Sequence, residues 1–154
     1  MHSHMSFHNP PALPHAEVVA ILERALLSPS QENESAAVDA LVGSALADED
    51  GDFVEHWCIQ VGTRAFGSNL RGLAALCLGH TARRFGRLTP EAIALARSLA
   101  RRALADPTDV GSQAIDGFED IEGFVFSRAR HIYRLPLWIR LRLPVPRRLT
   151  RAAK

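Results

Sequence analysis

Carboxylates gathered in two short stretches are the side chains of this sequence best suited to chemistry. One stretch spans residues 48–55 and the other spans residues 116–122. Two carboxylates can act as general acid and base, but only in a cleft that separates their pKa values, and packed helix surfaces offer no obvious cleft. We therefore interpret both stretches as surface that attracts a basic partner. The predicted partner-binding residues are Asp48, Glu49, Asp50, Asp52, Glu55, Trp57, Asp116, Glu119 and Asp120.

The spacing within the second stretch places its carboxylates on one side of a helix. Residues three and four positions apart are neighbours on a helix surface, so Asp116, Glu119 and Asp120 should point the same way. A partner surface and an ordinary solvated helix face both fit this pattern. Trp57 also leaves two possibilities, because it belongs either to the core or, if exposed, to an interface as an anchor.

Histidine and cysteine positions favour neither catalysis nor a metal centre. The sequence has no phosphate loop, Gly-x-Ser-x-Gly, Cys-x-x-Cys or His-Glu-x-x-His pattern. A metal would need further well-spaced ligands beside His56 or His80. Cys58 and Cys77 stand in apolar runs, which predicts buried thiols in a reducing cytoplasm. We therefore expect a cytoplasmic protein that is not an enzyme and needs no metal or cofactor.

Charge is distributed unevenly along the chain, although the formal net charge is only +1. Residues 1–60 carry ten acids and one base, whereas residues 128–154 carry nine bases and no acid. Such a basic stretch can bind phosphate or an anionic membrane surface, or it can neutralise the acidic N-terminal part. Nucleic-acid or membrane contacts would then come from Arg128, Arg130, Arg134, Arg140, Arg142, Arg147 and Arg148.

Helical periodicity dominates the sequence and must position these side chains. Ser35, Asp52 and Thr89 are expected to cap three of the helices, and residues 106–109 are expected to cap the last. No run of eighteen apolar residues is present, so no transmembrane helix is predicted. Apolar spacing of three and four predicts helices near residues 15–28, 35–47, 53–65, 70–85, 90–105 and from about 110 to Gly123 or beyond.

These elements divide the chain into three regions. Residues 1–14 are rich in His and Pro and predict a flexible leader, part of which resembles a purification tag. Residues 15–135 form the predicted helical domain. Residues 136–154 are rich in Arg and Pro, and their alternating Arg and apolar residues favour a strand. Because proline interrupts strand pairing, we expect an irregular basic tail instead.

One stretch of the sequence recurs in degraded form forty residues later. The copy that begins at Asn69 is matched by a copy that begins at Asp109, and Leu78 corresponds to Phe118. A period near forty with two helices per unit is typical of HEAT-type α-solenoids. The sequence therefore predicts an all-α fold, a short α-solenoid of about six helices in HEAT-like hairpins followed by the irregular basic tail.

The repeat region, residues 52–124, contains three motifs: Trp57-Cys58, Leu70-Arg71-x-Leu73-Ala74-x-x-Cys77-Leu78-Gly79-His80-x-Ala82-Arg83 and Asp116-x-x-Glu119-Asp120-Ile121-x-x-Phe124. With these motifs the region resembles the small HEAT-repeat immunity-type proteins encoded beside bacterial polymorphic and contact-dependent toxins. Two features depart from that pattern: Gly117, where Ala or Leu is more usual, and the Arg-rich extension after Ser127.

The resemblance implies a non-catalytic cytoplasmic protein that inactivates one cognate toxin by stoichiometric binding. Many such toxins are nucleases with basic surfaces, which would suit the acidic stretches. The main functional prediction is therefore an immunity protein. The alternative is a HEAT-type nucleic-acid or membrane-surface adaptor that acts through residues 128–154.

Overall fold

The structure, a computed structural model, describes residues 9–126 and 134–145, and every element within these residues is a helix. The prediction of an all-α chain is confirmed for this part of the sequence. None of these helices is long and apolar enough to cross a lipid bilayer. The helices are α1 (His15–Leu27), α2 (Gln31–Ala47), α3 (Gly51–Arg64), α4 (Ser68–Phe85), α5 (Pro90–Ala105), α6 (Gln113–Phe124) and α7 (Leu137–Arg140).

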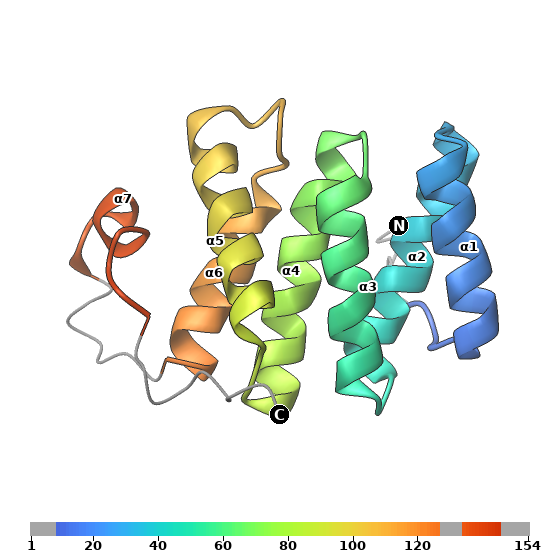
Figure 1. Cartoon of the computed structure of the whole chain (residues 1–154), viewed down its shortest axis with the longest axis horizontal. Helices are drawn as coiled ribbons and strands as arrows, with labels where there is room; N and C mark the ends of the chain where they lie inside the picture. Colours follow the sequence, from blue (N-terminus) through green and yellow to red (C-terminus); the bar gives the residue numbers. More distant parts are fainter. Residues whose placement is uncertain (1–8, 127–133, 146–154) are drawn as a thin grey trace, which may run out of the picture.

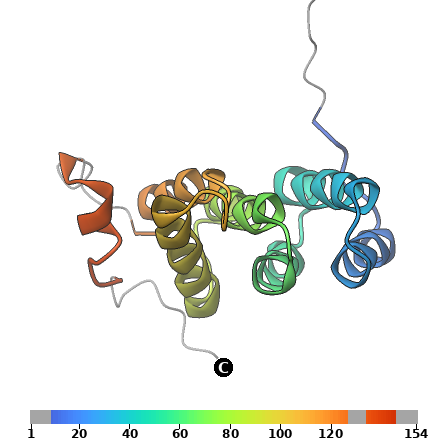
Figure 2. The same cartoon turned by 90° about the horizontal axis from the view of Figure 1, so that it is seen from above.

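The first six helices form two layers. Figure 1 shows them side by side in a row that follows the chain, with the short α7 at the far end beyond α5 and α6. The view from above in Figure 2 separates α2, α4 and α6 in one layer from α1, α3 and α5 in the other. Short turns join consecutive helices. Within a layer, each helix lies beside the helix two positions further along the chain.

Helix α5 begins as predicted, whereas α2 begins earlier. The Thr89 hydroxyl accepts the Ala92 N–H at 3.3 Å, and proline occupies the first helical position. For α2 the cap is Ser30, whose hydroxyl accepts the Asn33 N–H at 3.1 Å. The prediction of a cap at Ser35 was wrong because the acids that precede it suit the first turn of a helix, where they face the positive end of the dipole.

The starts of α3 and α6 also differ from the predictions. The Asp50 carboxylate, rather than that of Asp52, caps α3 and accepts the Phe53 N–H at 3.0 Å. Residues 106–109 do not cap α6; they form a separate turn in which Asp106 accepts the N–H of Thr108 at 2.9 Å. Helix α6 begins only at Gln113, without a side-chain cap.

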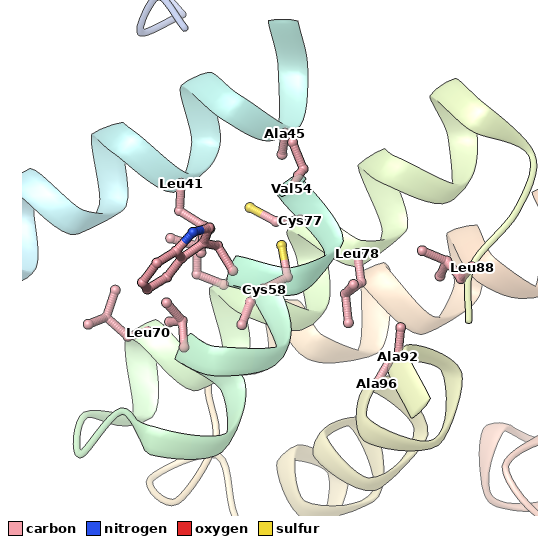
Figure 3. Close-up of a cluster of buried hydrophobic side chains, with 14 of the residues drawn as sticks. Leu41, Ala45, Val54, Cys58, Leu70, Cys77, Leu78, Leu88, Ala92 and Ala96 are labelled. Atoms are coloured by element: carbon pink, nitrogen blue, oxygen red, sulfur yellow. The ribbon is translucent and has the colours of Figure 1, made fainter. Parts of the chain in front are cut away.

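The core lies between the layers, and Figure 3 shows its centre at α3 and α4. Cys58 and Cys77 are fully buried there as free thiols. A hydrogen bond with Cys77, together with burial, raises the pKa of Cys58 well above its usual value. Trp57 is only 6% exposed and belongs to the same cluster. Of the two positions open to Trp57 from the sequence, it occupies the core.

Helices α4 and α6 approach so closely that their backbones touch. A methyl group added at Gly117 would lie 2.2 Å from the carbonyl oxygen of Ala75. One added at Gly79 would lie 2.7 Å from the carbonyl oxygen of Gly117. These separations are far below van der Waals contact, so only glycine fits at either position. The unusual glycine at position 117 therefore follows from this contact.

The segment after α6 is folded onto the end of the layers. Leu141 is buried, and its carbonyl accepts a hydrogen bond from the Arg101 guanidinium at 3.0 Å. Arg140 of α7 is buried beside Glu122 of α6. The predicted irregular tail thus contains a helical turn and a buried anchor within residues 134–145. Its remaining residues, 146–154, lie outside the described part of the chain.

The predicted leader also contacts the helices where it is described. Leu13 packs against the core. A methyl group at Gly43 of α2 would lie 2.3 Å from the carbonyl oxygen of Pro11, which places the chain directly against this helix. Residues 9–14 therefore cover part of α2, whereas residues 1–8 lie outside the described residues.

Candidate binding surfaces

Asp48, the first of the predicted partner-binding residues, is an internal connector between helices. Its side chain is 9% exposed and lies 2.8 Å from His15 Nε2. It also accepts the Asp50 N–H at 2.8 Å. The His15 ring stacks on Phe53, with ring centroids 3.6 Å apart. Asp48 thereby joins the start of α1 to the start of α3, and its carboxylate faces the protein.

Glu55 is likewise turned inward. It is 5% exposed and accepts the Thr89 N–H at 2.9 Å and the Thr89 hydroxyl as well. A buried carboxylate with two donors is satisfied, so Glu55 holds the start of α5 against α3. Asp52 is exposed but forms an ion pair with Arg87 at 2.9 Å. Asp50 is the α3 cap. Glu49 is exposed and has no ion pair within the described residues.

The second acidic stretch pairs with the chain's own arginines. Asp120 lies 3.0 Å from Arg83 of α4, which joins neighbouring helices. Glu119 forms an ion pair with Arg140, and Glu122 lies 3.1 Å from the same guanidinium. A residue predicted to bind a basic partner and a residue predicted to bind nucleic acid or membrane therefore bind each other. Asp116 is exposed and has no ion pair in the described residues.

The histidines considered as ligands are separated. His56 is exposed on α3, and its ring lies edge-on to Trp57 with centroids 5.6 Å apart. His80 is half-buried on α4, and burial lowers its pKa, with Asp120 opposing the shift and Arg83 adding to it. Among residues 9–126 and 134–145, no three His, Cys, Asp or Glu side chains gather as metal ligands would.

Helix α2 carries an acidic surface that was not among the sequence predictions. Glu32 and Asp39 are exposed, line one shallow hollow and have no ion pair in the part of the chain that the structure describes. Their spacing of seven residues, about two helical turns, would have predicted that they share one helix face. The predicted helix began only at residue 35, so Glu32 lay outside it. We call this surface the α2 face: Gln31, Glu32, Ser35, Ala36 and Asp39.

The described basic residues of the C-terminal region fall into two groups. Arg140 is buried, whereas Arg134 and Arg142 are exposed. Trp138 is 55% exposed, and the Arg142 guanidinium lies 5.7 Å from the centre of its ring. Arg128, Arg130, Arg147 and Arg148 lie outside the described residues. We call the exposed group around Trp138 the C-terminal patch: Arg101, Leu104, Trp138 and Arg142.

The described residues thus present an acidic surface at one end of the molecule and a basic, partly aromatic one at the other. The α2 face belongs to the second helix of the row and the C-terminal patch to its last elements (Figure 1). The side chains of the two acidic stretches that were predicted to bind a basic partner are divided between internal bonds and solvent. No family model matches this chain, and neither a curated protein nor a solved structure matches it.

Proposed function

We propose that this chain is a short α-solenoid of HEAT-like hairpins that acts as a non-catalytic protein-binding module. In such solenoids, corresponding helices of successive hairpins stack side by side. The two copies of the forty-residue repeat lie on α4 and at α6, which are neighbours in one layer, and α2 continues that layer (Figure 2). This arrangement supports the solenoid and provides broad helix surfaces for a partner.

The partner that we propose is a basic protein, specifically a cognate bacterial toxin inactivated by stoichiometric binding. The observation that carries this choice is the α2 face, where Glu32 and Asp39 are exposed without an ion pair in the described chain. Glu49 adds a further exposed carboxylate in the loop that follows the same helix. Exposed carboxylates without an ion pair accelerate association with a basic surface and favour it over other surfaces.

Neutralising the α2 face should weaken the complex. We expect Glu32→Gln combined with Asp39→Asn to raise the Kd for the basic protein encoded by the neighbouring gene about tenfold, mainly through slower association. Since screening weakens exposed charges, the difference should shrink as salt rises. Surface plasmon resonance at two ionic strengths measures the rates, and a toxicity assay measures neutralisation.

The matched control places the same change in net charge on the other layer. Ala20→Lys with Thr63→Lys alters exposed positions of α1 and α3 and also raises the net charge by two. Equal weakening by both double variants would contradict a role for the α2 face. A neighbouring gene product that is neither toxic nor bound by this chain would contradict the toxin-binding function itself.

A second candidate function is favoured by Trp138. An exposed tryptophan beside arginine can stack on an unpaired base or lie at a lipid headgroup boundary. Arg142 contacts the ring, and Arg101 lines the same hollow. These contacts support an adaptor that binds single-stranded nucleic acid or an anionic membrane through the C-terminal patch and the basic residues around it.

Point variants test this candidate better than removal of the tail, because Arg140 and Leu141 belong to the fold. Trp138→Ser with Arg142→Gln is expected to reduce binding of the full chain to single-stranded DNA or to phosphatidylserine vesicles at low salt by about tenfold. As the control, Phe66→Ser with Arg24→Gln removes another exposed aromatic ring and one charge elsewhere. Absence of binding by the unmodified chain at low salt, or equal losses in both variants, would exclude the adaptor.

A further inference from the structure

A groove with a volume of about 500 Å³ runs along the outer side of α5. Its lining residues on α5 include positions 90, 94, 97 and 101, which follow one another at helical spacing and therefore form a single stripe. Val145 of the C-terminal segment lines the groove as well. The groove thus exists because the C-terminal segment is docked beside α5.

The two halves of this groove differ in chemistry. Near the start of α5 the lining residues Ile93 and Ala94 are apolar, with Ala94 the exposed one, and Val145 adds a further apolar side chain to the groove. Near the end of α5 it is basic, with Arg97, Arg101 and Arg102. No lining residue is acidic. An occupant must therefore combine an apolar group with negative charge.

The arginines of the basic half have different contacts. Arg102 forms two hydrogen bonds with Asp109, at 2.7 and 2.8 Å, so its charge is already compensated. Arg101 is exposed and donates to the carbonyl of Leu141, a neutral acceptor that leaves its positive charge in place. Arg97 lies with its guanidinium 5.7 Å from the centre of the Phe118 ring. Arg101 is therefore the main candidate to receive a carboxylate, with Arg97 one turn away.

We infer that this groove binds an acidic segment of a partner protein, with an apolar side chain against Ala94 and a carboxylate at Arg101. The planar guanidinium presents paired donors that match a carboxylate, which favours this group over a diffuse negative surface. The C-terminal sequence after position 127 contains no Asp or Glu, so charge complementarity favours a segment from elsewhere. This site requires the opposite charge from the α2 face and does not rest on it.

A short peptide provides a direct probe. The rhodamine-labelled peptide Glu-Asp-Glu-Leu-Asp-Glu should bind the full chain in fluorescence anisotropy, more tightly at low salt. Ala94→Glu places a like charge and added bulk in the groove at an exposed position, and we expect it to raise the Kd at least about tenfold. Ala20→Glu makes the same substitution at an exposed position of α1 and should leave the Kd within about twofold.

The apolar half of the groove is tested with the peptide rather than with the protein. Replacing the leucine of the probe by alanine should raise its Kd about fivefold or more, the effect of losing a buried side chain. A site that reads charge alone would bind both peptides equally. Equal binding of the two peptides would overturn the inference, and so would unchanged binding by the Ala94→Glu variant.

A second pair of variants distinguishes loss of the binding site from loss of the fold. Arg101→Glu reverses the central charge, and Arg24→Glu makes the matched reversal on α1; circular dichroism melting establishes that each variant is folded. Only Arg101→Glu should abolish peptide binding. Light scattering of the unmodified chain covers the remaining possibility. A mass that rises with concentration and returns to the monomer value in Ala94→Glu would identify a second copy as the occupant and overturn the assignment to a partner.

Discussion

Replacing Gly117 by alanine is expected to lower the free energy of unfolding by about 3 kcal/mol. The added methyl carbon would lie 2.2 Å from the carbonyl oxygen of Ala75 and 2.7 Å from the Cα of Leu76. Both are backbone atoms and have no alternative rotamer, so α4 and α6 must separate along their shared face. Urea denaturation followed by circular dichroism measures the change directly.

Gly123 provides the matched control on the same helix. It is exposed, and alanine favours a helix over glycine by about 0.5–1 kcal/mol. We therefore expect Gly123→Ala to leave stability unchanged or to raise it slightly. If both substitutions cost the same, the close approach of α4 and α6 would not be what requires glycine at position 117.

Replacing Arg140 by methionine is expected to cost about 3–5 kcal/mol, the usual penalty for breaking a buried ion pair on one side. Glu122 is 0% exposed and lies 3.1 Å from this guanidinium. Without that cation, the buried carboxylate loses a close positive charge or gains water by release of the C-terminal segment. Denaturation measures the loss, and faster tryptic cleavage after Arg142 would reveal the release.

Two further variants separate this ion pair from a general effect of charge. Arg142→Met removes an exposed guanidinium two positions away and should change stability by less than about 0.5 kcal/mol. Arg140→Met together with Glu122→Leu should recover much of the loss, because apolar residues can replace a buried ion pair. Similar losses for the two arginine variants would show that burial beside Glu122 has no special importance.

Helix positions were largely predictable because amphipathic spacing is local. Helix α5 begins and ends where the sequence places it, with its Thr89 cap and following proline. Predicted helix starts were wrong where two suitable caps stand close together in the sequence, as Ser30 and Ser35 do around the start of α2. Neighbouring residues cannot decide between such caps, since the choice depends on which backbone the remaining helix packs against.

The binding surfaces were less predictable because a carboxylate's role depends on distant residues. Glu55 bonds to Thr89, Asp120 to Arg83 and Glu119 to Arg140, partners that stand 34, 37 and 21 positions away along the chain. Clustering in sequence therefore identified acids without showing which ones face solvent. Glu32 and Asp39 were not predicted for the opposite reason, because they stand apart in the sequence and share only a helix face.

The two thiols at the centre of the α3–α4 contact make opening of the native state chemically measurable. The hydrogen bond with Cys77 and burial keep Cys58 protonated, since both raise its pKa, and a protonated, fully buried thiol is nearly inert toward alkylating reagents. Alkylation must then await exposure of this hairpin. Its rate, followed by mass spectrometry, reports how often the hairpin opens. The chain therefore contains, in its own buried thiols, a chemical probe for motions at its centre.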